Sequence, residues 1–166
     1  MNKNLLRYSL YTLVASAFVA LIVSIIYKKQ NQKVPISTLP TTPFYSLDST
    51  LFDLQTIDNQ SIILIYFNSG CEHCQYEAKT FAENLPLFQP AKVVWFSSEN
   101  ITEIKNFANT YKLLPQANHV FLKANRQDLS KEFNNLSPPN IWIYKDKKVV
   151  RHFKGETKVE TLAKYL

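Results

Sequence analysis

Short apolar runs alternate with longer stretches of mixed polarity from residue 61 onward. Residues 61–67 and 93–96 are apolar runs of the kind that forms buried strands. The stretches 72–85 and 101–111 predict helices, and the first is expected to close near Pro86. Because strands that alternate with helices are joined by crossover connections, this order predicts a parallel sheet with helices packed on it.

The end of the chain follows another pattern. Residues 141–144 and 149–153 are apolar runs separated by four polar residues, which predicts a β-hairpin. Residues 157–166 predict a last amphipathic helix, and residues 120–122 predict a short additional strand. The expected order is therefore strand, helix, strand, helix, then two strands and a helix.

The N-terminal region carries no charge over the 20 residues 8–27 and is rich in Leu, Val, Ile, Ala and Phe. A helix of that length can cross a bilayer. A cleaved signal peptide would have a shorter apolar core followed by a small-residue cleavage site, whereas this run ends at the lysine pair 28–29. We therefore predict a single uncleaved transmembrane anchor that contacts membrane lipid.

The rest of the chain has the length and composition of one small globular domain. We expect an anchor over residues 1–29, a proline-containing linker over 30–43 and a domain over 44–166. Eleven Phe, nine Tyr and two Trp supply large apolar side chains for a core. The net charge of +6 comes from scattered lysines, which indicates a solvated surface with some attraction to anionic lipid and no nucleic-acid partner.

Cys71 and Cys74 are the only cysteines of the 166 residues, and they lie between a predicted strand and a predicted helix. The thiolate is the form that attacks a disulfide, and the free N–H groups and dipole at a helix N-terminus stabilise a negative charge. The pair therefore predicts reversible thiol-disulfide exchange, with Cys71 as the reactive thiol.

Such a pair also occurs in structural zinc sites and in structural disulfides. A structural zinc site usually has four Cys or His ligands, and no second pair follows here, because His119 and His152 are isolated. His73 lies inside the pair, where its ring should point away from the sulfurs. A disulfide that closes so short a loop would stabilise a fold of this size only weakly. Redox chemistry is therefore the favoured hypothesis.

The positive charges do not decide the orientation of the anchor, because nearly equal numbers of basic residues flank its two ends. A catalytic dithiol in a chain without other cysteines suits an oxidising compartment. We therefore expect a single-pass protein of the bacterial inner membrane, with its catalytic domain facing the periplasm or the cell exterior.

From about residue 39 to the C-terminus, the chain resembles the thioredoxin fold, and within it the membrane-anchored TlpA/ResA-like thiol-disulfide oxidoreductases. The CXXC motif follows a buried strand, residues 139–144 are similar to the family's proline-plus-strand segment, and Gly155 lies where thioredoxins have a glycine after the hairpin. Glu77, three residues after Cys74, matches the CXXC-x-x-E pattern of TlpA-like proteins. The resemblance implies an α/β, thioredoxin-like fold with a central mixed sheet and flanking helices, preceded by one transmembrane helix.

The resemblance also implies a role for each site residue. Cys71 would attack the substrate disulfide, and Cys74 would resolve the mixed disulfide. Pro139 would be the cis-proline that packs against the dithiol, although an ordinary trans proline is the commoner case. Pro138 before it has no N–H, so a backbone donor often used to pair with an extended substrate is absent. Glu77 would exchange a proton with the Cys74 thiol if it is buried, and a solvated helix residue is the alternative.

Glu72 and His73 between the cysteines bear on the redox direction. The motif Cys71-Glu72-His73-Cys74 is one residue away from the CEPC version found in TlpA-like proteins. A protonated His73 would stabilise the thiolate and make the disulfide more oxidising, as in the CPHC motif of DsbA-type oxidases, and Glu72 would act in the opposite direction. A DsbA-like oxidase is therefore an alternative.

The resemblance favours a reductase of protein disulfides, from a group that often serves cytochrome c maturation. It implies a membrane thiol-disulfide relay as electron donor, and neither a cofactor nor a metal. Peroxiredoxins share the fold, but their peroxidatic cysteine lies in a P-x-x-x-T-x-x-C context that is absent around Cys71. Copper-delivery proteins of the Sco type use a CXXXC pair, which is one residue longer than the pair here, and His119 would be their distant histidine.

Overall fold

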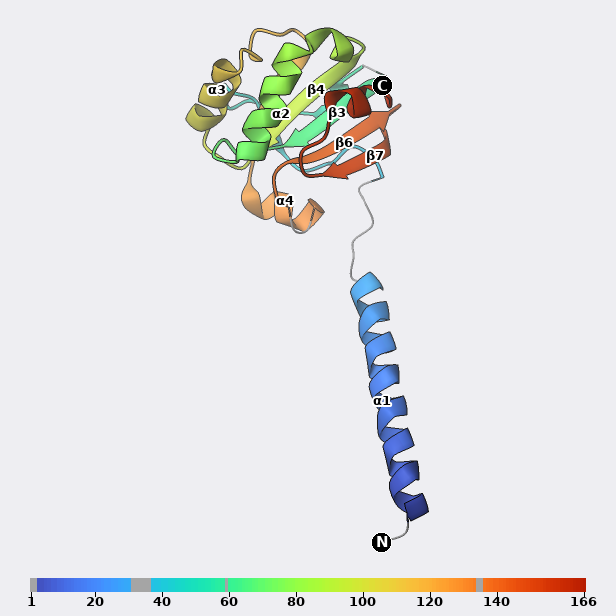
Figure 1. The fold of residues 1–166 in the computed structure, drawn as a ribbon. Helices are drawn as coiled ribbons and strands as arrows, with labels where there is room; N and C mark the ends of the chain where they lie inside the picture. Colours follow the sequence, from blue (N-terminus) through green and yellow to red (C-terminus); the bar gives the residue numbers. More distant parts are fainter. Residues whose placement is uncertain (1–2, 31–36, 59, 134–135) are drawn as a thin grey trace. The chain divides into compact units, whose positions relative to one another are not determined.

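The computed structural model describes residues 3–30, 37–58, 60–133 and 136–166 of the chain (Figure 1). The chain divides into two compact units, Met1–Val34 and Pro35–Leu166. Helix α1 (Lys3–Gln30) lies in the first unit, and the sheet lies in the second. Both cysteines therefore belong to the second unit.

We expected residues 1–29 to form a transmembrane anchor. The described part of this segment is helical. Among the residues that the structure describes, however, no helix is both long enough and apolar enough to cross a membrane. The prediction of a transmembrane anchor is therefore not confirmed.

The expected linker, residues 30–43, is described only in part, because residues 31–36 lie outside the described residues. Leu39, which follows them, is buried in the core of the second unit. Its backbone N–H donates a hydrogen bond to the carbonyl of Lys147 at 3.3 Å. The described end of the segment thus packs on the domain, because an apolar side chain there finds a buried site.

The second unit is built on a seven-stranded mixed sheet with the order β2-β1-β5-β4-β3-β6-β7. Its centre is parallel, since β3 pairs with β4 and β4 with β5 in the same direction. β6 runs antiparallel to β3, and β7 runs antiparallel to β6. The expected parallel centre and C-terminal hairpin are confirmed. The strands are β1 (Phe44–Tyr45), β2 (Leu51–Phe52), β3 (Ser61–Tyr66), β4 (Ala91–Ser97), β5 (His119–Ala124), β6 (Asn140–Lys145) and β7 (Lys148–Lys154).

Helices α2 (Glu72–Glu83) and α3 (Ile101–Thr110) form where the sequence predicted them. The 3-10 turn η2 (Leu85–Phe88) follows α2 and contains Pro86, which has no N–H to continue an α-helix. The turn η1 (Leu54–Thr56) begins at Asp53, whose carboxylate accepts a hydrogen bond from the N–H of Gln55.

Two helices differ from expectation. α5 (Val159–Ala163) is shorter than the predicted helix 157–166, with Lys158 at its N-cap and Lys164 at its C-cap. α4 (Arg126–Phe133) was not predicted, and its sequence offers little apolar signal, since Leu129 is the one fully buried residue among its eight.

Two apolar clusters cover the two faces of the sheet. α2, α3 and α5 pack on one face, and α4 packs with the segment before β3 on the other (Figure 1). The crossovers β3-α2-β4 and β4-α3-β5 advance in the same direction along the sheet, so right-handed connections bring α2 and α3 to the same face. The return from β5 to β6 runs the opposite way and brings α4 to the other face.

Aromatic stacking fixes α2 against the sheet. Phe81 of α2 stacks on Phe88 with ring centroids 4.1 Å apart, and it meets Trp95 of β4 edge-on at 5.3 Å. Phe67, just after β3, stacks on Phe107 of α3 at 4.4 Å. Such pairs contribute about 0.5–1.5 kcal/mol each beyond the burial of their area. The inner face of α2 is therefore held against the sheet by tightly packed rings.

Phe81→Ala should lower the free energy of unfolding by about 3–5 kcal/mol, because it leaves a cavity in this aromatic cluster. Tyr76→Ala, on the exposed side of the same helix, is the matched control and should change that free energy by less than about 0.5 kcal/mol. Denaturant unfolding of the two variants measures both values. Equal losses would contradict this description of the core.

Candidate active site

Cys71 and Cys74 lie at the junction between β3 and α2. The N–H of Phe67 donates to the carbonyl of Phe96 at 3.0 Å, so the chain stays paired with β4 for one residue after β3 ends. It then turns, and Cys71 occupies the N-cap position of α2. Cys71 is partly exposed, Cys74 is buried one turn further on, and both are free. The predicted dithiol at a strand-to-helix junction is therefore present.

The turn before Cys71 is held by Glu99, which the sequence reasoning did not single out. Its carboxylate accepts hydrogen bonds from the N–H (2.8 Å) and the hydroxyl (2.7 Å) of Ser69, and from the hydroxyl of Ser97 (3.0 Å). The carbonyl of Asn68 accepts a further bond from the N–H of Cys71 at 3.1 Å. Glu99 lies 30 residues from Ser69, so no local sequence pattern indicated this contact.

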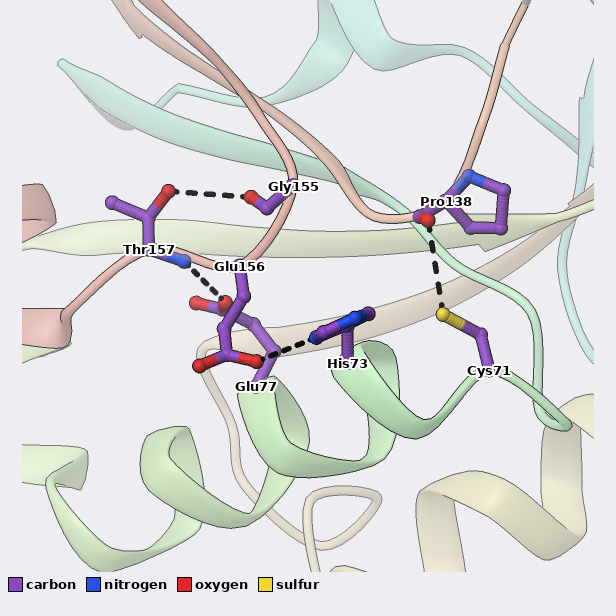
Figure 2. A network of polar contacts seen from close by, with 7 residues as sticks. All are labelled: Cys71, His73, Glu77, Pro138, Gly155, Glu156 and Thr157. Carbon is purple, nitrogen blue, oxygen red and sulfur yellow. Dashed lines mark hydrogen bonds and ion pairs between the residues drawn. The ribbon is translucent and has the colours of Figure 1, made fainter.

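A cis-proline loop lies next to Cys71 (Figure 2). The peptide bond between Pro138 and Pro139 is cis, as the resemblance implied. The carbonyl of Pro138 accepts a hydrogen bond from the Cys71 thiol, with Sγ and O 3.7 Å apart. The carbonyl of Pro139 accepts one from the N–H of Gly155 at 2.8 Å. Because Pro138 has no N–H, this residue offers a substrate backbone an acceptor and no donor.

Glu77 is fully buried, so the alternative of a solvated helix residue is wrong. Its Oε2 accepts a hydrogen bond from the N–H of Thr157 at 3.0 Å. Its Oε1 has no hydrogen-bond partner among the residues that the structure describes. The pKa of Glu77 is raised to about 7; burial is the largest cause, the Thr157 N–H partly offsets it, and the nearby charge of Glu156 adds to the rise. The carboxyl group therefore changes its protonation state near neutral pH.

Cys74 lies one helical turn before Glu77, on the same face of α2. Burial raises the pKa of the Cys74 thiol well above its usual range. A hydrogen bond from the backbone of Asn68 lowers this pKa, whereas the nearby Cys71 and Glu77 raise it. Cys74 is therefore protonated unless a neighbouring base removes its proton.

The two residues between the cysteines point outward. Glu72 is exposed in the first turn of α2. His73 is also exposed, and its Nδ1 lies 2.9 Å from Oε2 of Glu156. Figure 2 shows this pair beside the buried Glu77. Glu156 lies 83 residues after His73, so no local sequence pattern could predict this contact.

Each of the other histidines stacks on a tryptophan of the sheet. His119 begins β5 opposite Val93, at the end of the parallel strands remote from the CXXC turn, and its Nδ1 accepts a bond from Trp95 Nε1 at 3.2 Å. Burial lowers its pKa to about 4. The expectation that His119 could complete a copper site is therefore wrong. His152 stacks on Trp142, with ring centroids 4.7 Å apart.

A groove of about 270 Å³ lies beside the cysteine turn, between α2 and α3. Ser69 of the turn and Gln75 of α2 line one side, and the Nε2 of Gln75 donates to the carbonyl of Ser69 at 2.8 Å. Within the described residues, no group of three or more His, Cys, Asp or Glu could hold a metal ion. The remaining lining residues belong to α3 and the residue after it: Glu103, Asn106, Phe107, Thr110 and Tyr111.

Solved structures share this arrangement of strands and helices. A secreted disulfide oxidoreductase of Mycobacterium tuberculosis, described as homologous to E. coli DsbE, has a TM-score of 0.62 at 14% identity, covering 74% of this chain and 92% of that chain. StoA of Bacillus subtilis has a TM-score of 0.57 at 17% identity, covering 74% and 93%. A peroxiredoxin-like protein of Aquifex aeolicus has a TM-score of 0.60 at 13% identity, covering 78% and 86%.

At these identities the likeness shows the fold, which is α/β and thioredoxin-like with a mixed sheet, as expected. No curated protein matches the chain. The sequence itself matches a family over residues 31–153, a span that contains the cysteine turn, the cis-proline and the hairpin. The chain therefore belongs to the AhpC/TSA family.

Proposed function

We propose that this protein is a thiol-disulfide oxidoreductase that exchanges disulfides with protein substrates and acts as a reductase of the TlpA/ResA-like kind. The observation that carries the proposal is a partly exposed Cys71 with Cys74 buried behind it and the buried carboxyl group of Glu77 on the same helix face. One thiol can meet a substrate, the second is kept from solvent, and a proton acceptor lies one turn away.

The reaction proceeds in two exchanges. The Cys71 thiolate attacks one sulfur of the substrate disulfide, the S–S bond breaks, and the leaving sulfur takes a proton from solvent. Cys74 then gives its proton to the Glu77 carboxylate and attacks Sγ of Cys71, which releases the second substrate sulfur as a thiolate that takes a proton from solvent. The substrate gains two electrons and becomes a dithiol. Cys71 and Cys74 lose two electrons and become a disulfide.

Glu77 suits the second exchange. A group whose pKa lies near the working pH can both accept and return a proton. Because burial of a carboxyl group without full hydrogen bonding is unfavourable, Glu77 costs the fold stability at neutral pH. A strongly shifted carboxyl group next to a thiol pair is typical of a functional site rather than of a structural one.

The groove between α2 and α3 supports a polypeptide substrate. It runs from Ser69, two residues before Cys71, along α3 and combines polar groups with the rings of Phe107 and Tyr111. We propose that the chain flanking the substrate disulfide lies in this groove. Since Pro138 offers only an acceptor, side-chain contacts in the groove would carry more of the recognition than backbone pairing does.

The reductase direction is supported by the contact between His73 and Glu156. A carboxylate 2.9 Å from the imidazole offsets the positive charge that would otherwise stabilise the Cys71 thiolate and make the disulfide more oxidising. We also propose an extracytoplasmic location and a thiol-disulfide relay as electron donor. The M. tuberculosis relative is described as secreted, and dithiol exchange proteins serve oxidising compartments.

Peroxide reduction is the second candidate, because the chain belongs to the AhpC/TSA family and one similar structure is a peroxiredoxin-like protein. The P-x-x-x-T-x-x-C context would need proline at 64 and threonine at 68, where this chain has Leu64 and Asn68. If the reduced protein consumed hydrogen peroxide much faster than a peptide disulfide, this second candidate would replace the first.

Cys74→Ser should trap a mixed disulfide with a peptide disulfide, because Cys71 can still attack and nothing resolves the product. Cys71→Ser should form such an adduct at least ~100-fold more slowly, since the buried Cys74 is shielded and protonated. Mass spectrometry of the intact chain measures both. Similar adduct yields in the two variants would contradict the assigned order of the cysteines.

Glu77 should make the free energy of unfolding depend on pH. Its pKa is 4.5 in ordinary surroundings and about 7 in the fold, so the folded protein holds the proton more tightly than the unfolded chain does. The stability that this proton provides is complete below pH 4.5 and is lost as the pH rises through about 7. The loss should amount to about 3 kcal/mol.

Glu77→Gln should remove this pH dependence, because the amide does not titrate. Glu83→Gln, at the exposed end of the same helix, is the matched control and should retain it. Urea unfolding of wild type and both variants below pH 4.5 and above pH 7 measures the difference. A wild-type dependence that survives in Glu77→Gln would show that another group is responsible.

A further inference from the structure

The segment 155–157, between β7 and α5, contacts three parts of the active site (Figure 2). Two of its contacts use backbone N–H groups and one uses a side chain. They are Gly155 N–H to the Pro139 carbonyl (2.8 Å), Glu156 Oε2 to His73 Nδ1 (2.9 Å) and Thr157 N–H to Glu77 Oε2 (3.0 Å). Gly155 has a φ of +87°, a left-handed conformation that favours glycine.

The pair of His73 and Glu156 has little value for stability. The His73 side chain is 73% exposed and that of Glu156 is 38% exposed. Pairs this exposed contribute about 0–1 kcal/mol. What distinguishes this pair is its location, since it keeps a carboxylate in place directly beside the residue that binds Glu77.

A nearby charge can change the protonation of Glu77. One of its oxygens is held by Thr157, and the other has no hydrogen-bond partner within the described part of the chain. A carboxylate near another carboxyl group disfavours ionisation of that group. For Glu77, burial is the larger cause of the raised pKa, and the charge of Glu156 adds to it.

The other charged groups near this segment are few. Lys154 and Lys158 flank it in the sequence and are exposed to solvent. On α2, a Cys74 thiolate and a Glu77 carboxylate disfavour each other. Among the charged groups of the described residues, Glu156 is therefore the one outside α2 that raises the pKa of Glu77.

We propose that Glu156 is a positioning residue for Glu77: His73 of the CXXC motif holds its carboxylate beside Thr157, the residue whose N–H binds Glu77, and the negative charge there adjusts how readily Glu77 takes the Cys74 proton. This inference rests on the proposed thiol-disulfide exchange, in which the Glu77 carboxylate is the acceptor. It gives His73 a role apart from the Cys71 thiolate, because His73 keeps the Glu156 carboxylate in place.

Glu156→Gln tests the proposal, because it removes the charge and keeps an amide oxygen that can accept from His73. In the reduced full-length chain, the titration of Glu77, followed by the carboxyl carbon signal in NMR, should move to lower pH. The pH profile of the resolving step, measured from the mixed disulfide with a peptide, should move in the same direction. In a Glu77→Gln background, Glu156→Gln should leave that profile unchanged.

Glu160→Gln is the matched control, since it removes one charge from an exposed position of α5 and should leave the Glu77 titration unchanged. If Glu156→Gln left that titration unchanged, or if Glu160→Gln moved it equally, the proposal would be overturned. The NMR titration needs no substrate, so it tests the role of Glu156 separately from the proposed thiol-disulfide exchange. If the protein exchanges disulfides but Glu156→Gln does not change the titration of Glu77, only the role of Glu156 is wrong. If Glu156→Gln changes that titration but the protein exchanges no disulfide, the proposed function is wrong.

Discussion

Burial of the inner face of α2 is the constraint on which the site depends. The aromatic packing that seats Phe81 on Trp95 also brings Cys74 and Glu77 out of water, because all three side chains lie on the same side of the helix. A buried thiol does not ionise readily, and a buried carboxyl group keeps its proton up to about pH 7. The two groups are therefore matched, since each one limits the charge of the other and a proton can pass between them during resolution.

Segments that follow α2 in the sequence complete the site around the two cysteines. The cis-proline loop presents a carbonyl to Cys71, and the segment after β7 ties that loop to Glu77 and to the histidine of the motif. Glu99 fixes the turn from the other side of the junction. The Cys71 thiol is thus positioned by contacts between residues that are distant in sequence. Such contacts keep the geometry of a reactive site rigid.

Local pattern was enough to predict the central strands, α2, α3 and the hairpin. The strands β3, β4 and β6 bury runs of apolar residues, and α2 and α3 each bury apolar residues at helical spacing. The spacing of Cys71 and Cys74 and the resemblance around Pro139 indicated the site. Sequence could not predict Glu99 or Glu156, whose partners lie 30 and 83 residues away. It also missed α4, in which a single residue is fully buried. The strands β1 and β2 were missed because two residues are too few to show an alternation of apolar and polar positions. The membrane-spanning prediction for residues 1–29 rested on a 20-residue uncharged run and on the absence of a cleavage site after it, and it is not confirmed among the described residues.

The most direct test of the account is the equilibrium reduction potential of the Cys71/Cys74 pair in the full-length chain, titrated against a dithiol buffer. The account predicts one reversible two-electron transition at about −250 mV or below, the range of thioredoxin-like reductases. A potential near about −120 mV would mark a DsbA-like oxidant and contradict the reductase direction. If Cys71 and Cys74 formed no reversible disulfide at all, the central claim of thiol-disulfide exchange would be wrong.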